Sequence, residues 1–174
     1  MIANKCRFAP TPRQRLDGIR HIVYEYANLL SAAYHSMNGR APWRRTHCDD
    51  AFLLGCRKIG DFLMKDRRSK RHGQELDDIL ALDYLPTKVA RHWELPIWSN
   101  WQEAMNKQLA HLSYSREKGW DHRLWVPRIE AEFRKAWWCF RDAVVSQEYG
   151  EEFDKQLRSC QTKVGFENIP LHRR

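Results

Sequence analysis

A-F-L-L-G-C-R-K-I-G-D-F-L-M, residues 51–64, is the stretch on which the predicted fold depends. Four apolar residues recur in it at helical spacing and form one stripe: Phe52, Cys56, Ile59 and Leu63. Other apolar side chains cover most of the remaining circumference. A helix that is apolar nearly all round is usually buried, so the stretch predicts a central, buried helix.

Two charged residues interrupt this apolar helix. Arg57 and Asp61 are one turn apart at i,i+4, so they lie on one face and can form an ion pair. Burying two charges is costly unless they are matched, and removing one partner of such a pair typically costs about 3–5 kcal/mol. We therefore expect a buried Arg57–Asp61 pair at the centre of the fold.

Composition bounds the class of protein. The 174 residues suffice for one domain with a sizeable core, and eight Trp, seven Phe and six Tyr supply large apolar side chains. No run approaches the roughly 18–20 apolar residues of a membrane span, and the first residues lack the apolar region of a secretory signal. These features predict a soluble, cytoplasmic protein. The five cysteines are widely spaced without a C-x-x-C pair, so we expect reduced structural thiols and neither a metal nor a cofactor.

Helical spacing continues on both sides of the central stretch. Thr11-Pro12 is a helix start signal, and the pattern after it predicts a long helix over Thr11–Met37, ended by Asn38-Gly39. We expect a loop over Arg40–His47, with Asp49 as the cap of the central helix.

Later segments give further helices. Glu75–Leu85 is predicted to be a short helix or a turn-rich segment, closed by Pro86. A second short helix is predicted at Thr87–Trp93, and a long one from Pro96 to about Arg116. A last long helix begins at Pro127, with Trp137 facing inward and Trp138 near the surface. Gly150 ends that helix, and Glu151–Cys160 forms one more short one.

No alternating strand pattern competes with these helices. The predicted fold is therefore all-α: a single-domain bundle of four long helices plus short accessory helices. Its expected organisation is an irregular arm over residues 1–10, a bundle over 11–160 and a loose tail over 161–174.

The predicted helix ending at Arg116 offers partners for Asp61. Arg116 falls on the same line as the apolar stripe of its helix, while His111 lies about a third of a turn away with Lys107 one turn before it. The residues that we expect in one polar network are Arg57, Asp61, Lys107, His111 and Arg116. Arg116 has a simpler explanation as a cation at a helix C-terminus.

Four segments occur in an order that resembles a known group of proteins. They are D-A-F-L-L-G-C-R-K-I-G-D-F-L, D-D-I-L-A-L-D-Y-L-P, N-K-Q-L-A-H-L-S-Y-S-R and W-V-P-R-I-E-A-E-F, within about residues 49–145. Their order is similar to that in a family of small bacterial all-helical proteins described as HEPN-like. The resemblance implies a helical bundle in which Arg57, Asp61, His111 and Arg116 are the recurring polar positions. It also implies a homodimer and, for some members, a role in stress or phage defence.

Ribonucleases of the HEPN type use an Arg and a His separated by four to six residues, which stabilise phosphate charge and take part in acid–base cleavage. By this resemblance, a metal-independent endoribonuclease would use Arg116 with His111 or His122 as catalytic residues. The sequence contains no Gly-rich phosphate loop, no H-E-x-x-H motif and no serine nucleophile elbow, so it gives no sign of the chemistry that these motifs perform.

The positive charge points to a polyanion as partner. The net charge is +8 and the sequence pI about 9.4, a balance that favours contact with nucleic acid. One dense basic patch lies in the presumed loop after Met64, and the residues that we expect to bind nucleic acid are Lys65, Arg67, Arg68, Lys70 and Arg71.

Three functions remain open from the sequence. The first is a binding module for RNA or a protein partner. The second is the endoribonuclease described above. The third is a structural or interaction protein in which the polar network is a buried clasp that fixes the helix register.

Overall fold

The computed structural model describes residues 8–39, 42–68, 70–71, 74–86, 91–98, 122–163, 166 and 169–171. Its elements are α1 (Pro12–Asn38), α2 (Pro42–Met64), β1 (Lys70–Arg71), β2 (Gln74–Glu75), the 3-10 helix η1 (Ala81–Tyr84), α4 (His122–Ala143) and α5 (Gln147–Gln161). The predicted all-α class is confirmed. The strands are two residues each and form one antiparallel pair. Of the predicted helix from Pro96 to Arg116, the structure describes only residues 96–98, which are helical.

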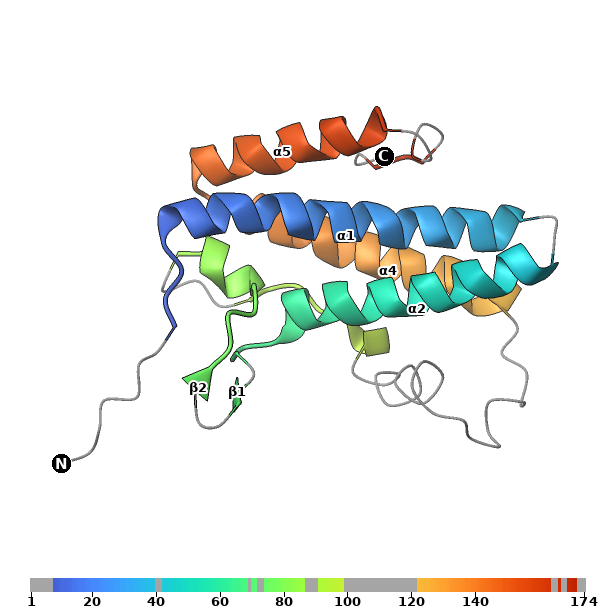
Figure 1. Ribbon diagram of the computed structural model, residues 1–174, viewed down its shortest axis with the longest axis horizontal. Coiled ribbons are helices and arrows are strands. Elements are labelled where there is room, and N and C mark those ends of the chain that lie inside the picture. The colour runs from blue at the N-terminus through green and yellow to red at the C-terminus, as the bar shows by residue number, and fades with distance from the viewer. Residues whose placement is uncertain are drawn as a thin grey trace.

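The helix α1 begins as the sequence predicts. The Thr11 hydroxyl accepts a hydrogen bond from the Gln14 N–H, and the Gln14 side chain accepts one from the Thr11 N–H. This reciprocal capping box satisfies two backbone donors that a helix start leaves unpaired, and Pro12 has no N–H to satisfy. The helix then runs through the whole molecule and packs against α2, α4 and α5 (Figure 1).

The helix α2 starts seven residues before the predicted cap. The expected loop over Arg40–His47 is wrong from Pro42 onward, because the proline opens the helix. Asp49 is not a cap: it is 4% exposed inside α2 and accepts a hydrogen bond from the Ser36 hydroxyl of α1. A buried hydrogen bond between the two helices takes the place of the expected N-terminal cap.

Two glycines of α2 allow close packing. A Cβ at Gly55 would lie 3.1 Å from the Leu29 Cα of α1, so the missing side chain lets the two backbones approach. A Cβ at Gly60 would lie 2.5 Å from the Trp98 ring, which packs there and against Phe133 of α4. Both contacts place apolar surface around the central helix.

The core is largely aromatic. Trp137 is fully buried, as the sequence predicts, and stacks on Tyr26 with ring centroids 4.0 Å apart. Edge-to-face contacts connect Phe140 to Phe62 and to Phe153, so one cluster joins α2, α4 and α5. Aromatic pairs in this geometry add about 0.5–1.5 kcal/mol each beyond burial.

The C-terminal part differs from the prediction in three places. The helix α4 begins at His122 and carries Pro127 in its interior, and Gly150 lies inside α5 rather than ending a helix. The Arg141 guanidinium donates to the Gly150 carbonyl and to Asp154, which ties α4 to α5.

The expectation of a loose tail is wrong for the part that the structure describes. Phe166, Ile169 and Leu171 are 8%, 2% and 0% exposed and belong to the core. Of the two alternatives for Glu75–Leu85, a short helix or a turn-rich segment, the structure shows the second, since only the four residues of η1 are helical.

Candidate nucleic-acid interface

The predicted Arg57–Asp61 pair does not form. Arg57 is exposed on α2, and among the described residues Asp61 pairs with Lys65 instead, with Lys65 Nζ 2.9 Å from Asp61 Oδ2. The two side chains are 37% and 29% exposed, so this pair lies at the surface. Within the described part of α2, one face is exposed to solvent, and Leu54 on it is 45% exposed. The expected all-round burial of this helix is therefore wrong.

The rest of the predicted polar network cannot be placed. Lys107, His111 and Arg116 lie outside the described residues. His111 and Arg116 are also the expected catalytic residues of the endoribonuclease. His122, the alternative histidine, is the first residue of α4. The clasp and the endoribonuclease stay predictions.

The predicted basic loop contains a small β-hairpin. Its strands pair Lys70 with Glu75 and Arg71 with Gln74, and the hairpin hangs from the C-terminal end of α2 (Figure 1). Pairing the strands fixes the backbone of residues that the sequence placed in an unstructured loop. Of the predicted basic patch, Lys70 and Arg71 therefore have a backbone fixed by strand pairing.

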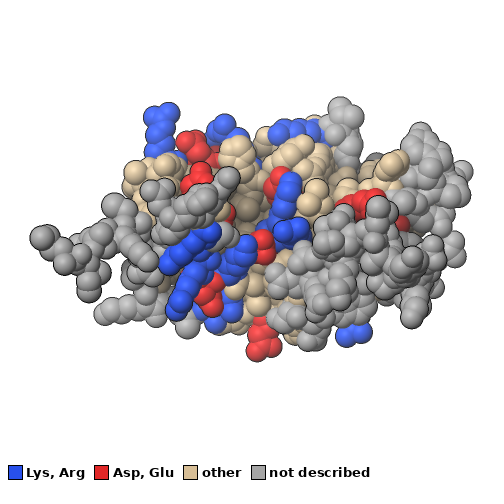
Figure 2. Space-filling view, turned by 60° about the horizontal axis from the view of Figure 1, so that its bottom comes forward, with Lys and Arg blue, Asp and Glu red and all other residues tan. Residues whose placement is uncertain are grey.

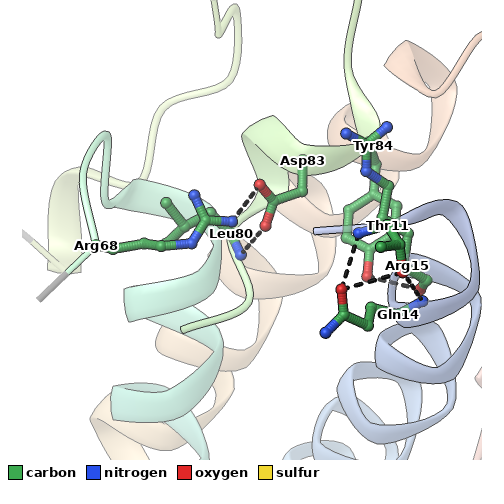
Figure 3. Close-up of polar contacts among 7 residues, drawn as sticks. All are labelled: Thr11, Gln14, Arg15, Arg68, Leu80, Asp83 and Tyr84. Atoms are coloured by element: carbon green, nitrogen blue, oxygen red, sulfur yellow. Dashed lines mark hydrogen bonds and ion pairs between the residues drawn. The ribbon is translucent and has the colours of Figure 1, made fainter. Parts of the chain in front are cut away.

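Arg68 is an anchor of this segment rather than an exposed phosphate ligand. Its guanidinium lies 2.5 Å from Asp83 Oδ1, with side-chain exposures of 11% and 10%, and 5.0 Å above the Phe8 ring. Asp83 also accepts a hydrogen bond from the Leu80 N–H, 3.0 Å away, which starts η1 (Figure 3). A charge-assisted, nearly buried pair of this kind fixes both segments it joins.

A second contact holds η1 on α1. The Tyr84 hydroxyl donates a 3.0 Å hydrogen bond to the Arg15 carbonyl (Figure 3). Burial, with the neighbouring Asp83 carboxylate, raises the pKa of Tyr84 well above its usual range, so the hydroxyl remains a donor. Arg15, Arg68 and Asp83 line a cavity of about 210 Å³ beside these contacts.

Arg91 fixes the start of the same segment. Its guanidinium donates to the Met64 carbonyl, the last residue of α2, and lies 3.1 Å from the Asp66 carboxylate. The last carbonyls of a helix have no partner within it, so a cation there satisfies one of them and complements the helix dipole.

Among the predicted nucleic-acid ligands of residues 65–71, two basic side chains remain available to bind a ligand. Arg67 and Lys70 are exposed, and no acidic side chain among the described residues pairs with either. Figure 2 shows Lys and Arg side chains gathered on the face that carries the hairpin, with acidic side chains between them. Of the five predicted nucleic-acid ligands, the structure leaves these two exposed, engages Lys65 and Arg68, and does not describe the Arg71 side chain.

Sequence reasoning missed Asp83 and Arg91 as the residues that organise this surface. Asp83 lies fifteen residues from Arg68, and no periodicity links the two. The only signal was the acidic composition around Asp77, Asp78 and Asp83, which fits a helix cap equally well.

Other chemistry finds little support in the part of the chain that the structure describes. Cys48, Cys56, Cys139 and Cys160 are free thiols, as expected. No group of three or more His, Cys, Asp or Glu residues arranged to hold a metal ion occurs among the described residues. No described helix is long and apolar enough to cross a membrane.

Comparison with known proteins adds no relationship. No family model, no curated protein and no solved structure matches this chain. The HEPN-like resemblance therefore stays a prediction.

Proposed function

We propose that this protein binds single-stranded RNA through the basic hairpin segment, residues 65–71. The observation that carries the proposal is that one basic side chain of the segment anchors it while two others remain exposed. Arg68 is pinned by Asp83, while Arg67 and Lys70 are exposed beside it without an acidic partner among the described residues.

The physical argument rests on preorganisation. An exposed cation loses side-chain entropy when it binds a phosphate, and a backbone that is already ordered adds no further ordering cost. The Arg91–Met64 contact holds the start of the segment, the Arg68–Asp83 contact holds its middle, and strand pairing at Lys70 and Arg71 holds its end. The net charge of +8 adds long-range attraction for a polyanion.

RNA is favoured over an acidic protein by the chemistry of these side chains. Guanidinium and ammonium groups on a protruding hairpin reach phosphates along a flexible strand, and such binding tolerates the mixture of charges around it. The endoribonuclease alternative would use residues outside the described part of the chain.

The test is the salt dependence of binding. Affinity for a fluorescently labelled single-stranded RNA oligonucleotide is measured by anisotropy over a range of KCl concentrations. The slope of log K against log salt is negative, and each lost phosphate contact reduces its magnitude by about 0.7 on a single strand. Arg67→Gln with Lys70→Gln should therefore reduce the magnitude by about 1.4.

The control removes the same charge elsewhere. Lys155 and Arg158 are exposed on α5, which lies on the other side of α1 from the hairpin (Figure 1). Lys155→Gln with Arg158→Gln should change affinity little. Equal effects of the two double variants, or binding that salt does not weaken, would refute the hairpin as the RNA site.

A further inference from the structure

A second feature lies away from the hairpin. A groove of about 730 Å³ is bounded by α1, α4 and the C-terminal segment at Ile169 and Pro170. Pockets for small organic ligands usually have volumes of about 300–1,000 Å³ and mostly apolar walls. This groove is several times larger than the cavity at Arg68 and has the size of a ligand site.

Its walls are apolar and partly open. Leu30 and Ala33 of α1 form one side and Trp138 of α4 the other, with Ile169 closing the end. Met37, also in the lining, is 43% exposed and adds apolar surface near the end of α1. A ligand with an apolar body would cover it.

The groove is preformed by an ion pair. The Arg134 guanidinium donates to the Glu130 carboxylate of its own helix and to the Pro170 carbonyl. The second bond holds the C-terminal segment against α4, so the wall at Ile169 and Pro170 stands without a ligand.

The same pair settles the charge of the site. Glu130, Arg134 and Lys135 are the charged residues among those that line the groove. Glu130 and Arg134 neutralise each other, and Lys135 is exposed with no acidic partner among the described residues. The groove therefore has one uncompensated positive charge beside an apolar surface.

From this geometry we propose that the groove binds a small amphipathic organic anion. Its apolar body, aromatic or aliphatic, lies against Leu30, Met37 and Trp138, and its single negative group contacts the Lys135 ammonium. The site is independent of the RNA-binding segment.

Two dyes of nearly the same skeleton test the proposal. 8-Anilinonaphthalene-1-sulfonate has one negative charge, and N-phenyl-1-naphthylamine lacks the sulfonate; both become fluorescent in apolar sites. We expect each to bind the full chain with one site per molecule. Lys135→Gln should weaken binding of the anionic dye about two- to fivefold, the range for one partly solvated charge pair, and leave the neutral dye unchanged. Lys155→Gln on α5 is the matched control.

A second variant tests the location. Ala131 lines the groove and is exposed, so the indole of Ala131→Trp should occupy part of the groove without disturbing the core, as an unchanged melting temperature would verify. Binding of both dyes should then be weakened. The proposal is overturned if this variant binds the dyes like the original chain, if neither dye binds, or if Ala131→Trp dissociates an oligomer, which would make the groove a contact between copies.

Discussion

Replacing Arg68 by Gln should destabilise the protein far more than the loss of a surface cation would. The Arg68 and Asp83 side chains are 11% and 10% exposed, so Gln would leave a nearly buried carboxylate whose one remaining partner among the described residues is the Leu80 N–H. Breaking a buried pair in this way costs about 3–5 kcal/mol. Because both groups retain some solvent contact, the expected loss lies near the lower end, about 3 kcal/mol. That is a large part of the 5–15 kcal/mol typical of a folded domain.

The assay is urea unfolding followed by tryptophan fluorescence, with Lys65→Gln as the control. The Lys65–Asp61 pair is much more exposed, and such pairs contribute about 0–1 kcal/mol. Asp83→Asn in the Arg68→Gln background should recover part of the loss, because the unpaired charge is then gone.

This result separates an anchor from a ligand. If Arg68→Gln loses no more stability than Lys65→Gln, the pair does not hold the hairpin segment and the reasoning is refuted. A stable Arg68→Gln variant with a reduced salt slope for RNA would instead make Arg68 a direct phosphate contact.

Three further predictions concern buried residues. Tyr26 is fully buried and its hydroxyl has no hydrogen-bond partner among the described residues, so Tyr26→Phe should change the free energy of unfolding by less than about 0.5 kcal/mol or raise it. Tyr84→Phe should instead lower the free energy of unfolding by about 0.5–1.5 kcal/mol, because it removes the hydrogen bond to the Arg15 carbonyl. Burial raises the pKa of both tyrosines in the folded protein. Their contribution to stability is therefore complete below the unfolded pKa near 10 and is lost at higher pH, where the tyrosines of the unfolded chain ionise first. Tyr26→Phe should make the melting temperature fall less steeply at alkaline pH, and an unchanged fall would contradict this. Gly60→Ala should destabilise by about 1–3 kcal/mol because its Cβ would lie 2.5 Å from the Trp98 ring, while Gly150→Ala, facing the flexible end of Arg141 at 3.0 Å, should cost less; equal urea midpoints would show that Trp98 moves freely.

The start of α1 shows what local sequence can determine. Thr11, Pro12 and Gln14 are close in the chain, and their preferences all point to a helix start, so prediction and structure agree there. The inward position of Trp137 was likewise readable from helical spacing. The all-α class follows from the sum of such local signals.

Asp61 shows where local reasoning stops. Arg57 and Lys65 both stand four residues from it, on opposite sides, and helix geometry allows either pair. Which one forms, and whether it is buried, depends on which face of α2 turns toward α1 and α4. The predicted stripe of Phe52, Cys56, Ile59 and Leu63 is indeed buried, but Leu54, which is also apolar, is 45% exposed and gave no sign of the open face.

The candidate interface depended on tertiary structure in the same way. The cluster of basic residues after Met64 can be seen in the amino-acid order alone. The sequence did not show that Arg68 pairs with Asp83 or that Arg91 binds the end of α2. It also did not show that the C-terminal segment is buried against the bundle. Local propensities act over one or two helical turns, whereas these contacts join segments fifteen or more residues apart. Only the packing of the helices brings them together and leaves Arg67 and Lys70 exposed.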